Sequence, residues 1–333
     1  MAITVTAAFE KFRQEFVDLD PGEVGTARKS RDFLIEQIYK LPDNDNSFPW
    51  LTGQRVLFGS FARRTKIRPL DDIDIMIVMH GGGGTEVQSL FDEFESKINP
   101  GTMGSPVRLL HDTADYINSN RVLYKFRGAL SDIPQYEQAE LHKNYEAVTL
   151  KLKSYPWNFD IVPTFGVTDG QSPLIYYVIP DGKGHWKRTD PRKDDARVVT
   201  ANKKHDGLVI PTIRQLKYWN HYNQSPTMRS YWLESIALTV FEEIDPMKLI
   251  RIGLVYFFSH AINKVQEPCP DPKGLGPNLD ADVDTESRQK IVDALKRAAE
   301  NSLAAINYEA EEDHRNAITE WRKIFGPSFP SYG

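Results

Sequence analysis

The stretch that decides the fold runs from Leu57 to Val78 and reads L-F-G-S-F-A-R-R-T-K-I-R-P-L-D-D-I-D-I-M-I-V. It begins as an apolar β-type segment, stops at Gly59-Ser60, crosses a basic linker and resumes as an apolar strand. Successive side chains of a strand point to opposite faces, so Asp72 and Asp74 project from the same face. Two neighbouring carboxylates favour a bound cation. Mg²⁺ typically uses one or two carboxylates together with substrate phosphates, and we therefore expect a divalent metal here.

The residues before these aspartates are suited to phosphate. Gly59 lets the backbone approach a ligand, while Ser60 and Thr65 offer hydroxyls to phosphate oxygens. A bare D-x-D pair is also common on a solvated strand edge. The order here is a strand, a Gly-Ser turn, Thr65 and then paired aspartates on the next strand. That order resembles the nucleotidyltransferase signature of the polymerase β type.

A third carboxylate is expected from a later strand, because two-metal phosphoryl transfer needs more ligands than one pair supplies. Asp160 stands among apolar neighbours in F-D-I-V-P, residues 159–163. A carboxylate buried without a partner is unfavourable, so Asp160 faces either a basic side chain or the metal held by Asp72 and Asp74. Given the upstream signature, we predict the metal. Asp160 is then placed to orient or deprotonate an attacking hydroxyl.

Composition narrows the class of protein. A chain of 333 residues with 40% hydrophobic content can bury a large core, and we expect two lobes. The net charge of −5 argues against a general nucleic-acid binder. The single cysteine, Cys269, excludes a disulfide framework and a multi-cysteine zinc site. With no signal peptide and no membrane-spanning run, we expect a cytoplasmic protein without membrane contact.

Periodicity predicts how the rest of the chain is organised. Apolar stripes predict one or two helices over residues 9–39 and another helix over residues 87–98. A β-hairpin is expected between residues 173 and 189, and helices follow it. Residue Ser230 is predicted to cap the helix over 230–242, whose free backbone N–H groups are a place for phosphate. We assign residues 1–200, with the N-terminal helices, to a catalytic lobe and residues 201–333 to a helical lobe with a short, loose C-terminal tail.

With these pieces placed, most of the chain resembles the bacterial cGAS/DncV-like nucleotidyltransferases (CD-NTases), the second-messenger synthases of CBASS anti-phage systems. The resemblance rests on five segments: G-S-F-A-R-R-T (59–65), D-D-I-D (71–74), F-D-I-V-P (159–163), R-Q-L-K-Y-W (214–219) and S-Y-W-L-E (230–234). It implies an α+β fold, with a mixed-sheet nucleotidyltransferase lobe packed against a helical C-terminal lobe and the active site in the cleft.

The resemblance also implies a site. Asp72, Asp74 and Asp160 would hold two Mg²⁺ ions, for which Mn²⁺ can substitute. Ser60, Lys217 and Ser230 would hold the donor triphosphate. An aromatic side chain such as Tyr231 would stack a base, although core packing is an equally good interpretation of that residue.

The implied reaction joins NTPs, with ATP among them, into a cyclic di- or trinucleotide and releases pyrophosphate. With one cysteine the chain lacks the zinc insertion of the animal DNA sensor, so no long-DNA activator is expected. A partner from the same operon is expected to regulate the enzyme or to conjugate its C-terminal Gly333. The alternative is a template-independent nucleotidyltransferase acting on an RNA or protein acceptor, which would share the same catalytic residues.

Overall fold

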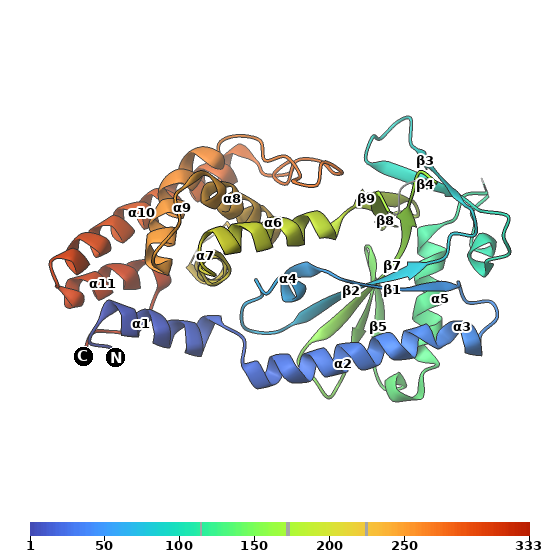
Figure 1. Cartoon of the computed structure of the whole chain (residues 1–333), viewed down its shortest axis with the longest axis horizontal. Coiled ribbons are helices and arrows are strands. Elements are labelled where there is room, and N and C mark those ends of the chain that lie inside the picture. Colours follow the sequence, from blue (N-terminus) through green and yellow to red (C-terminus); the bar gives the residue numbers. More distant parts are fainter. Residues whose placement is uncertain (114, 171–173, 224–225) are drawn as a thin grey trace. The chain divides into compact units, whose positions relative to one another are not determined.

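The computed structural model describes residues 1–113, 115–170, 174–223 and 226–333. The chain divides into two compact units, each built from separate stretches of sequence (Figure 1). The sheet unit comprises Pro21–Arg63 and Leu70–Pro191. The helical unit comprises Met1–Asp20, Arg64–Pro69 and Arg192–Gly333.

The sheet unit has a mixed β-sheet with helices around it. Its elements in chain order are α2 (Pro21–Tyr39), α3 (Leu41–Asn44), β1 (Leu51–Leu57), α4 (Gly59–Ala62), β2 (Asp72–Met79), β3 (Thr85–Gln88), β4 (Glu95–Asn99), η2 (Pro106–Leu109), α5 (Ser119–Ser131), η3 (Pro134–Tyr136), β5 (Glu140–Asn144), β6 (Ala147–Lys151), β7 (Asn158–Val167), β8 (Tyr176–Pro180) and β9 (Trp186–Thr189). The predicted hairpin is present as β8 and β9, and its first predicted residue, Pro173, lies outside the described residues.

The strand order is β1-β2-β7-β8-β9-β4-β3, and β6 joins β5 to β7. Strands β2 and β7 pair in parallel, whereas the other pairs are antiparallel. Alternate residues at the start of β2, Ile73 and Ile75, are buried, which leaves Asp72 and Asp74 on the other face. Helix α5 packs on the sheet and buries Val122, Leu123 and Phe126. The predicted mixed-sheet architecture is therefore confirmed.

The prediction of a helix over residues 87–98 is wrong, because this stretch spans strands β3 and β4. Contacts with distant strands explain why this stretch forms strands and not a helix. The Glu86 carboxylate accepts hydrogen bonds from Arg188 Nε on β9 at 2.7 Å and from the Tyr176 hydroxyl on β8 at 2.6 Å. Burial, together with the Glu86 charge, raises the pKa of Tyr176 to about 12. These contacts join the β3–β4 hairpin to the main sheet, and periodicity within the hairpin cannot show them.

The helical unit is a bundle with one large apolar core. Its elements are α1 (Val5–Phe12), the π-helical turn η1 (Arg13–Val17), α6 (Pro191–Lys204), α7 (Val209–Asn223), α8 (Ser230–Glu243), α9 (Ile250–Lys264), α10 (Thr285–Ala310) and α11 (His314–Phe325). Helices α10 and α11 lie side by side (Figure 1). Gly326, with φ of +73°, ends α11.

The compact units differ from the predicted division at residue 200, because the first 20 residues belong with the helices of the C-terminal half. Aromatic packing is the reason. Phe9 contacts Trp321 with ring centroids 5.0 Å apart, and Phe12 contacts Phe325 at 5.0 Å. The predicted loose C-terminal tail is also wrong. Phe329 is fully buried against the same phenylalanines, and the Ala2 N–H donates to the Ser331 carbonyl at 2.8 Å.

A six-residue strap, Arg64–Pro69, belongs to the helical unit although it lies between two stretches of the sheet unit in sequence. The Arg64 carbonyl accepts a hydrogen bond from Arg214 Nε on α7 at 2.7 Å. The Arg68 N–H donates to the Val17 carbonyl at 3.1 Å, and the Arg68 guanidinium donates to the Asp18 carbonyl. The strap is thus held by backbone groups as well as side chains of the helical unit.

Candidate active site

Three carboxylates converge where strands β2 and β7 of the sheet unit begin. Asp72 and Asp74 are the first and third residues of β2, and Asp160 is the third residue of β7. Because these strands are parallel and in register, Asp74 lies directly beside Asp160. One oxygen of each carboxylate lies within 4.8 Å of the others, and all three residues are half-buried. The structure brings these side chains together as the sequence predicts, while their catalytic roles stay predictions.

The three aspartates fit a divalent metal ion. Ionised carboxylates this close repel one another, and a multivalent cation among them removes the repulsion. Oxygen ligands of this kind suit Mg²⁺ and Mn²⁺. Among the described residues, no other group of three or more histidine, cysteine or acidic side chains has this spacing. The triad is therefore able to bind a metal ion.

Gly59 packs directly against the triad. It has φ of +76°, and a Cβ atom built on it would lie 1.8 Å from Asp74 Oδ2. Both facts require glycine at this position. Ser60 follows as the second residue of α4 and is half-buried. The predicted Gly-Ser turn is thus a short helical turn that begins at the Asp74 carboxylate.

Thr149 is a site residue that the sequence analysis missed. It lies on β6 directly opposite Asp160, and its hydroxyl donates to Asp160 Oδ1 at 2.5 Å. This hydrogen bond orients the carboxylate and leaves its other oxygen, Oδ2, outside the contact. Nothing in the local sequence marks Thr149, because its partner depends on the register between two strands.

Thr65 and Lys217 meet inside the helical unit. Lys217 Nζ lies 2.8 Å from Glu234 Oε2, and it donates to the Thr65 hydroxyl at 3.2 Å. The Thr65 hydroxyl in turn donates to Glu234 Oε2 at 2.9 Å. Thr65 is fully buried, and its hydroxyl, which the sequence predicts to face a phosphate, donates to a protein acceptor. Glu234 ends the S-Y-W-L-E segment, and nothing in that local sequence indicates its partners.

Ser230 and Tyr231 open helix α8. The prediction that Ser230 caps this helix is wrong, because the N-cap residue is Arg229 and Ser230 is the first helical residue. Ser230 is exposed, so its hydroxyl and the first backbone N–H groups of α8 lie at the surface of the helix terminus. This placement is compatible with the predicted phosphate contact, which remains a prediction.

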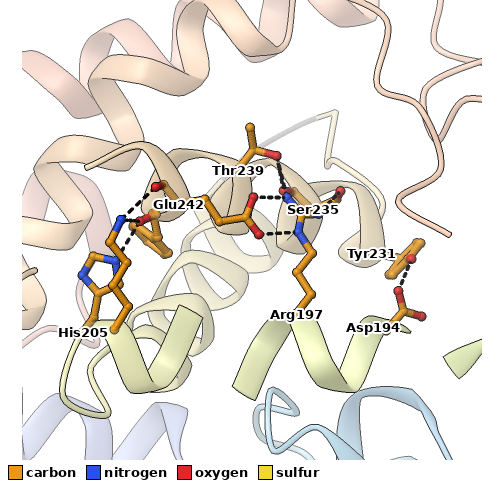
Figure 2. A network of polar contacts seen from close by, with 9 residues as sticks. Asp194, Arg197, His205, Tyr231, Ser235, Thr239 and Glu242 are labelled. Carbon is orange, nitrogen blue, oxygen red and sulfur yellow. Dashed lines mark hydrogen bonds and ion pairs between the residues drawn. The ribbon is translucent and has the colours of Figure 1, made fainter. Parts of the chain in front are cut away.

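The Tyr231 side chain is held by polar contacts (Figure 2). Its hydroxyl donates to Asp194 Oδ1 on α6 at 2.6 Å, as Figure 2 shows. The same hydroxyl accepts from Lys273 Nζ at 2.7 Å. The Lys273 ammonium also lies 4.3 Å from the ring centroid, in a cation–π contact. Tyr231 is therefore fixed in orientation, and base stacking on its ring stays a prediction.

A second set of contacts in Figure 2 joins α6 to α8. The Arg197 guanidinium donates to both carboxylate oxygens of Glu242, at 2.7 and 2.9 Å, and to the hydroxyls of Thr239 and Ser235. His205 Nε2 lies 2.7 Å from the Phe241 carbonyl, while its Nδ1 accepts from the Met247 N–H. These contacts set the position of the helix that carries Ser230, Tyr231 and Glu234.

Comparisons with known proteins were made on sequence and on structure. No protein-family model matches the chain. A probable cyclic nucleotide synthase of Bacillus cereus (strain VD146) is 40% identical over 337 residues, which span 100% of this chain and 99% of the relative. A cyclic AMP-AMP-GMP synthase of Enterobacter hormaechei is 24% identical and covers 83% of this chain and 80% of its own length.

Solved structures share the fold. Escherichia coli MS115-1 CdnC with ATP superposes with a TM-score of 0.70 at 17% identity and covers 97% of this chain and 98% of its own. Vibrio cholerae DncV in complex with ATP and GTP gives a TM-score of 0.69 at 11% identity, over 96% of this chain and 94% of its own.

No helix among the described residues is both long enough and apolar enough to cross a bilayer. Because the Bacillus relative is 40% identical over the whole chain, this protein belongs to the bacterial cGAS/DncV-like nucleotidyltransferases, the family of the cyclic nucleotide synthases.

Proposed function

We propose that this protein joins nucleoside triphosphates into a cyclic di- or trinucleotide second messenger and releases pyrophosphate. The convergence of Asp72, Asp74 and Asp160 carries the proposal. Further support comes from the relative named a cyclic AMP-AMP-GMP synthase and from the DncV structure that holds ATP and GTP. NTPs, with ATP among them, are accordingly the expected substrates.

Two Mg²⁺ ions are the metals we assign to the triad, with Mn²⁺ as a substitute. When bound, they would activate the attacking hydroxyl and stabilise the charge on the leaving pyrophosphate. Asp72 and Asp74 hold this position through the parallel pairing of β2 with β7. The Thr149 hydrogen bond leaves Asp160 Oδ2 to orient the acceptor ribose hydroxyl and to receive its proton.

The remaining residues hold the donor. Ser60 donates its hydroxyl to the donor phosphates, and Gly59 keeps the backbone beside Asp74 clear of a side chain. Lys217 and Ser230 are the further residues that we propose to bind the triphosphate. In each step the acceptor ribose oxygen bonds to the donor α-phosphorus. The bond between that phosphorus and the oxygen bridging it to the β-phosphate breaks, and pyrophosphate leaves. A further attack by the free ribose hydroxyl of the linear intermediate closes the ring.

Product analysis tests the proposal. Purified protein is incubated with all four NTPs and Mg²⁺ or Mn²⁺, treated with phosphatase and examined by mass spectrometry, with Asp72→Asn/Asp74→Asn as the control. A phosphatase-resistant cyclic product that is absent from the control supports the proposal and identifies its bases. Transfer of nucleotides to an added RNA or protein, without any cyclic product, would establish the alternative transferase instead.

We also propose a setting of anti-phage defence with a regulatory partner protein. Membership of the family supports the defence setting. The CdnC structure, which was solved as a complex with a HORMA protein, supports the partner. Cells carrying the wild-type gene with its neighbouring genes should resist phage, and cells carrying the Asp72→Asn/Asp74→Asn variant should not. Equal plaque counts on the two strains would exclude this setting while leaving the chemistry to the product assay.

A further inference from the structure

A closed ring of polar contacts lies in the interior of the helical unit. Glu234 Oε2 on α8 accepts from both Lys217 on α7 and Thr65 on the strap, and Lys217 also donates to Thr65. The three residues are 1%, 6% and 0% exposed, respectively. A buried ion pair adds little net stability compared with apolar residues of similar size, so a gain in stability alone does not account for this one.

Thr65 belongs to this ring and is also close in sequence to the predicted catalytic residues. It lies five residues after Ser60 and seven residues before Asp72. The strap around it has its own anchors, the Arg214 contact to the Arg64 carbonyl and the Arg68 contacts to Val17 and Asp18. Thr65 therefore holds a fixed position against which the long, flexible Lys217 side chain is oriented.

We propose that Thr65 and Glu234 are positioning residues for Lys217: Thr65 sets where the ammonium lies, and Glu234 sets how much of its charge a nucleotide experiences. The inference rests on the proposed function, in which Lys217 acts on the donor triphosphate. It replaces the direct phosphate contact expected of Thr65 with an indirect one. It also gives Glu234 a role in nucleotide affinity.

The two residues are expected to act with opposite signs. Removing the Thr65 hydroxyl takes away one of the contacts that orient Lys217, so nucleotide binding weakens. Replacing Glu234 by glutamine keeps an oxygen that accepts from Lys217 but removes the charge that neutralises it. The ammonium then attracts a triphosphate more strongly, so binding becomes tighter even though the buried ion pair has been lost.

Equilibrium binding to the full-length protein tests this. The probes are the four 2′,3′-dideoxynucleoside triphosphates with Mg²⁺, which lack both attacking hydroxyls and so bind without turnover. Calorimetric titration compares wild type, Thr65→Val, Thr65→Ser and Glu234→Gln, and the thermal midpoint of each is recorded. We expect Thr65→Val to raise the Kd about tenfold, as for a lost hydrogen bond to a charged group, with Thr65→Ser near wild type. Glu234→Gln should bind more tightly than wild type despite a lower midpoint.

Contrary results are equally clear. An unchanged Kd in Thr65→Val, or weaker binding in both variants in proportion to their lost stability, would show that the ring is only structural. No binding of any probe to wild type would also overturn the inference. If the wild type binds probes but forms no cyclic product from NTPs, the proposed function fails, and the Thr65→Val and Glu234→Gln comparison still decides the inference.

Discussion

Gly59 is constrained by its backbone conformation and by its contact with the carboxylate triad of Asp72, Asp74 and Asp160. Its φ of +76° disfavours any residue with a Cβ, and that Cβ would also overlap Asp74 Oδ2. Gly53 separates the two effects, because it has φ of +75° but no atom within 4 Å of a built Cβ. The two glycines therefore share a positive φ, and only Gly59 has the contact with Asp74.

We predict that Gly59→Ala abolishes product formation as completely as loss of Asp74 does, because the new methyl displaces that carboxylate. Gly53→Ala has the same backbone strain and should retain activity near the wild-type value. Pyrophosphate release measures both variants, and circular dichroism checks that both fold. A Gly59→Ala enzyme with activity equal to that of Gly53→Ala would contradict the placement of Gly59 against Asp74.

Thr149 supports a second prediction at the residue scale. Its hydroxyl holds Asp160 Oδ1 at 2.5 Å, and loss of such a supporting contact typically costs about 10- to 100-fold in metal affinity or activity. Thr149→Val should raise the Mg²⁺ concentration needed for half-maximal activity by about that factor, while Thr149→Ser stays close to wild type. A magnesium titration of the initial rate gives the answer. Equal magnesium requirements in all three proteins would remove Thr149 from the site.

At the scale of elements, contacts between distant segments decide what periodicity leaves open. The stretch 87–98 has helical spacing, yet Glu86 and the β4–β9 pairing make it part of the sheet. Helix α5 is tied in the same way to the segment before β1. The Asp45 carboxylate accepts from Lys125 Nζ at 2.7 Å and from the Ser47 hydroxyl at 2.6 Å.

The Asp45 contact makes stability depend on pH. The hydrogen bond from Lys125, followed by those from Ser47, lowers the pKa of Asp45 from 3.8 to about 2. Because the folded-state pKa is depressed, its contribution is present above about pH 4 and is lost as pH falls toward 2. Lys125→Met should thus lower the free energy of unfolding by a constant amount above pH 5, and the difference should shrink below about pH 4.

Urea unfolding from pH 7 to pH 3 measures this difference. The control is Lys11→Met, since Lys11 lies 3.9 Å from Glu15 on an exposed surface. Its difference from wild type should stay flat between pH 4 and pH 3. A Lys125→Met difference that stays equally flat in that range would show that Asp45 is not stabilised by Lys125.

At the scale of the whole molecule, each unit is assembled from stretches far apart in the sequence. The helical unit needs α1, because Phe9 and Phe12 fill space against Trp321, Phe325 and Phe329. A helix at one end of the chain therefore completes a core made by the other end. The predicted assignment of the first 20 residues to the catalytic lobe did not account for this long-range packing, whereas α2 does belong to the sheet unit.

The packing of the N-terminal aromatic side chains can be measured through the free energy of unfolding. Phe12 is fully buried, and Phe12→Ala should lower the free energy of unfolding of the helical unit by about 3–5 kcal/mol. Phe16 lies on the same apolar stripe but is 39% exposed, so Phe16→Ala should cost clearly less. Chemical unfolding followed by tryptophan fluorescence compares them, since Trp321 lies in this core. Equal losses in both variants would contradict the burial of α1.

The sequence by itself determined the features that depend on local spacing. The placement of Asp72 and Asp74 on one strand face follows from the two-residue period of a strand. The Gly-Ser turn and the separate strand with Asp160 follow from the glycine and from the apolar run at 159–163. Together with the segments at 214–219 and 230–234, these features identify the family and the three carboxylates from the sequence alone.

Only the tertiary structure decided which distant groups meet. Thr149 became the partner of Asp160 through strand register, and Glu234 became the partner of Lys217 and Thr65 through packing of α7, α8 and the strap. The first 20 residues likewise joined the C-terminal helices through buried aromatic contacts. Such pairings depend on how separate segments pack, and neither periodicity nor a local motif records that information.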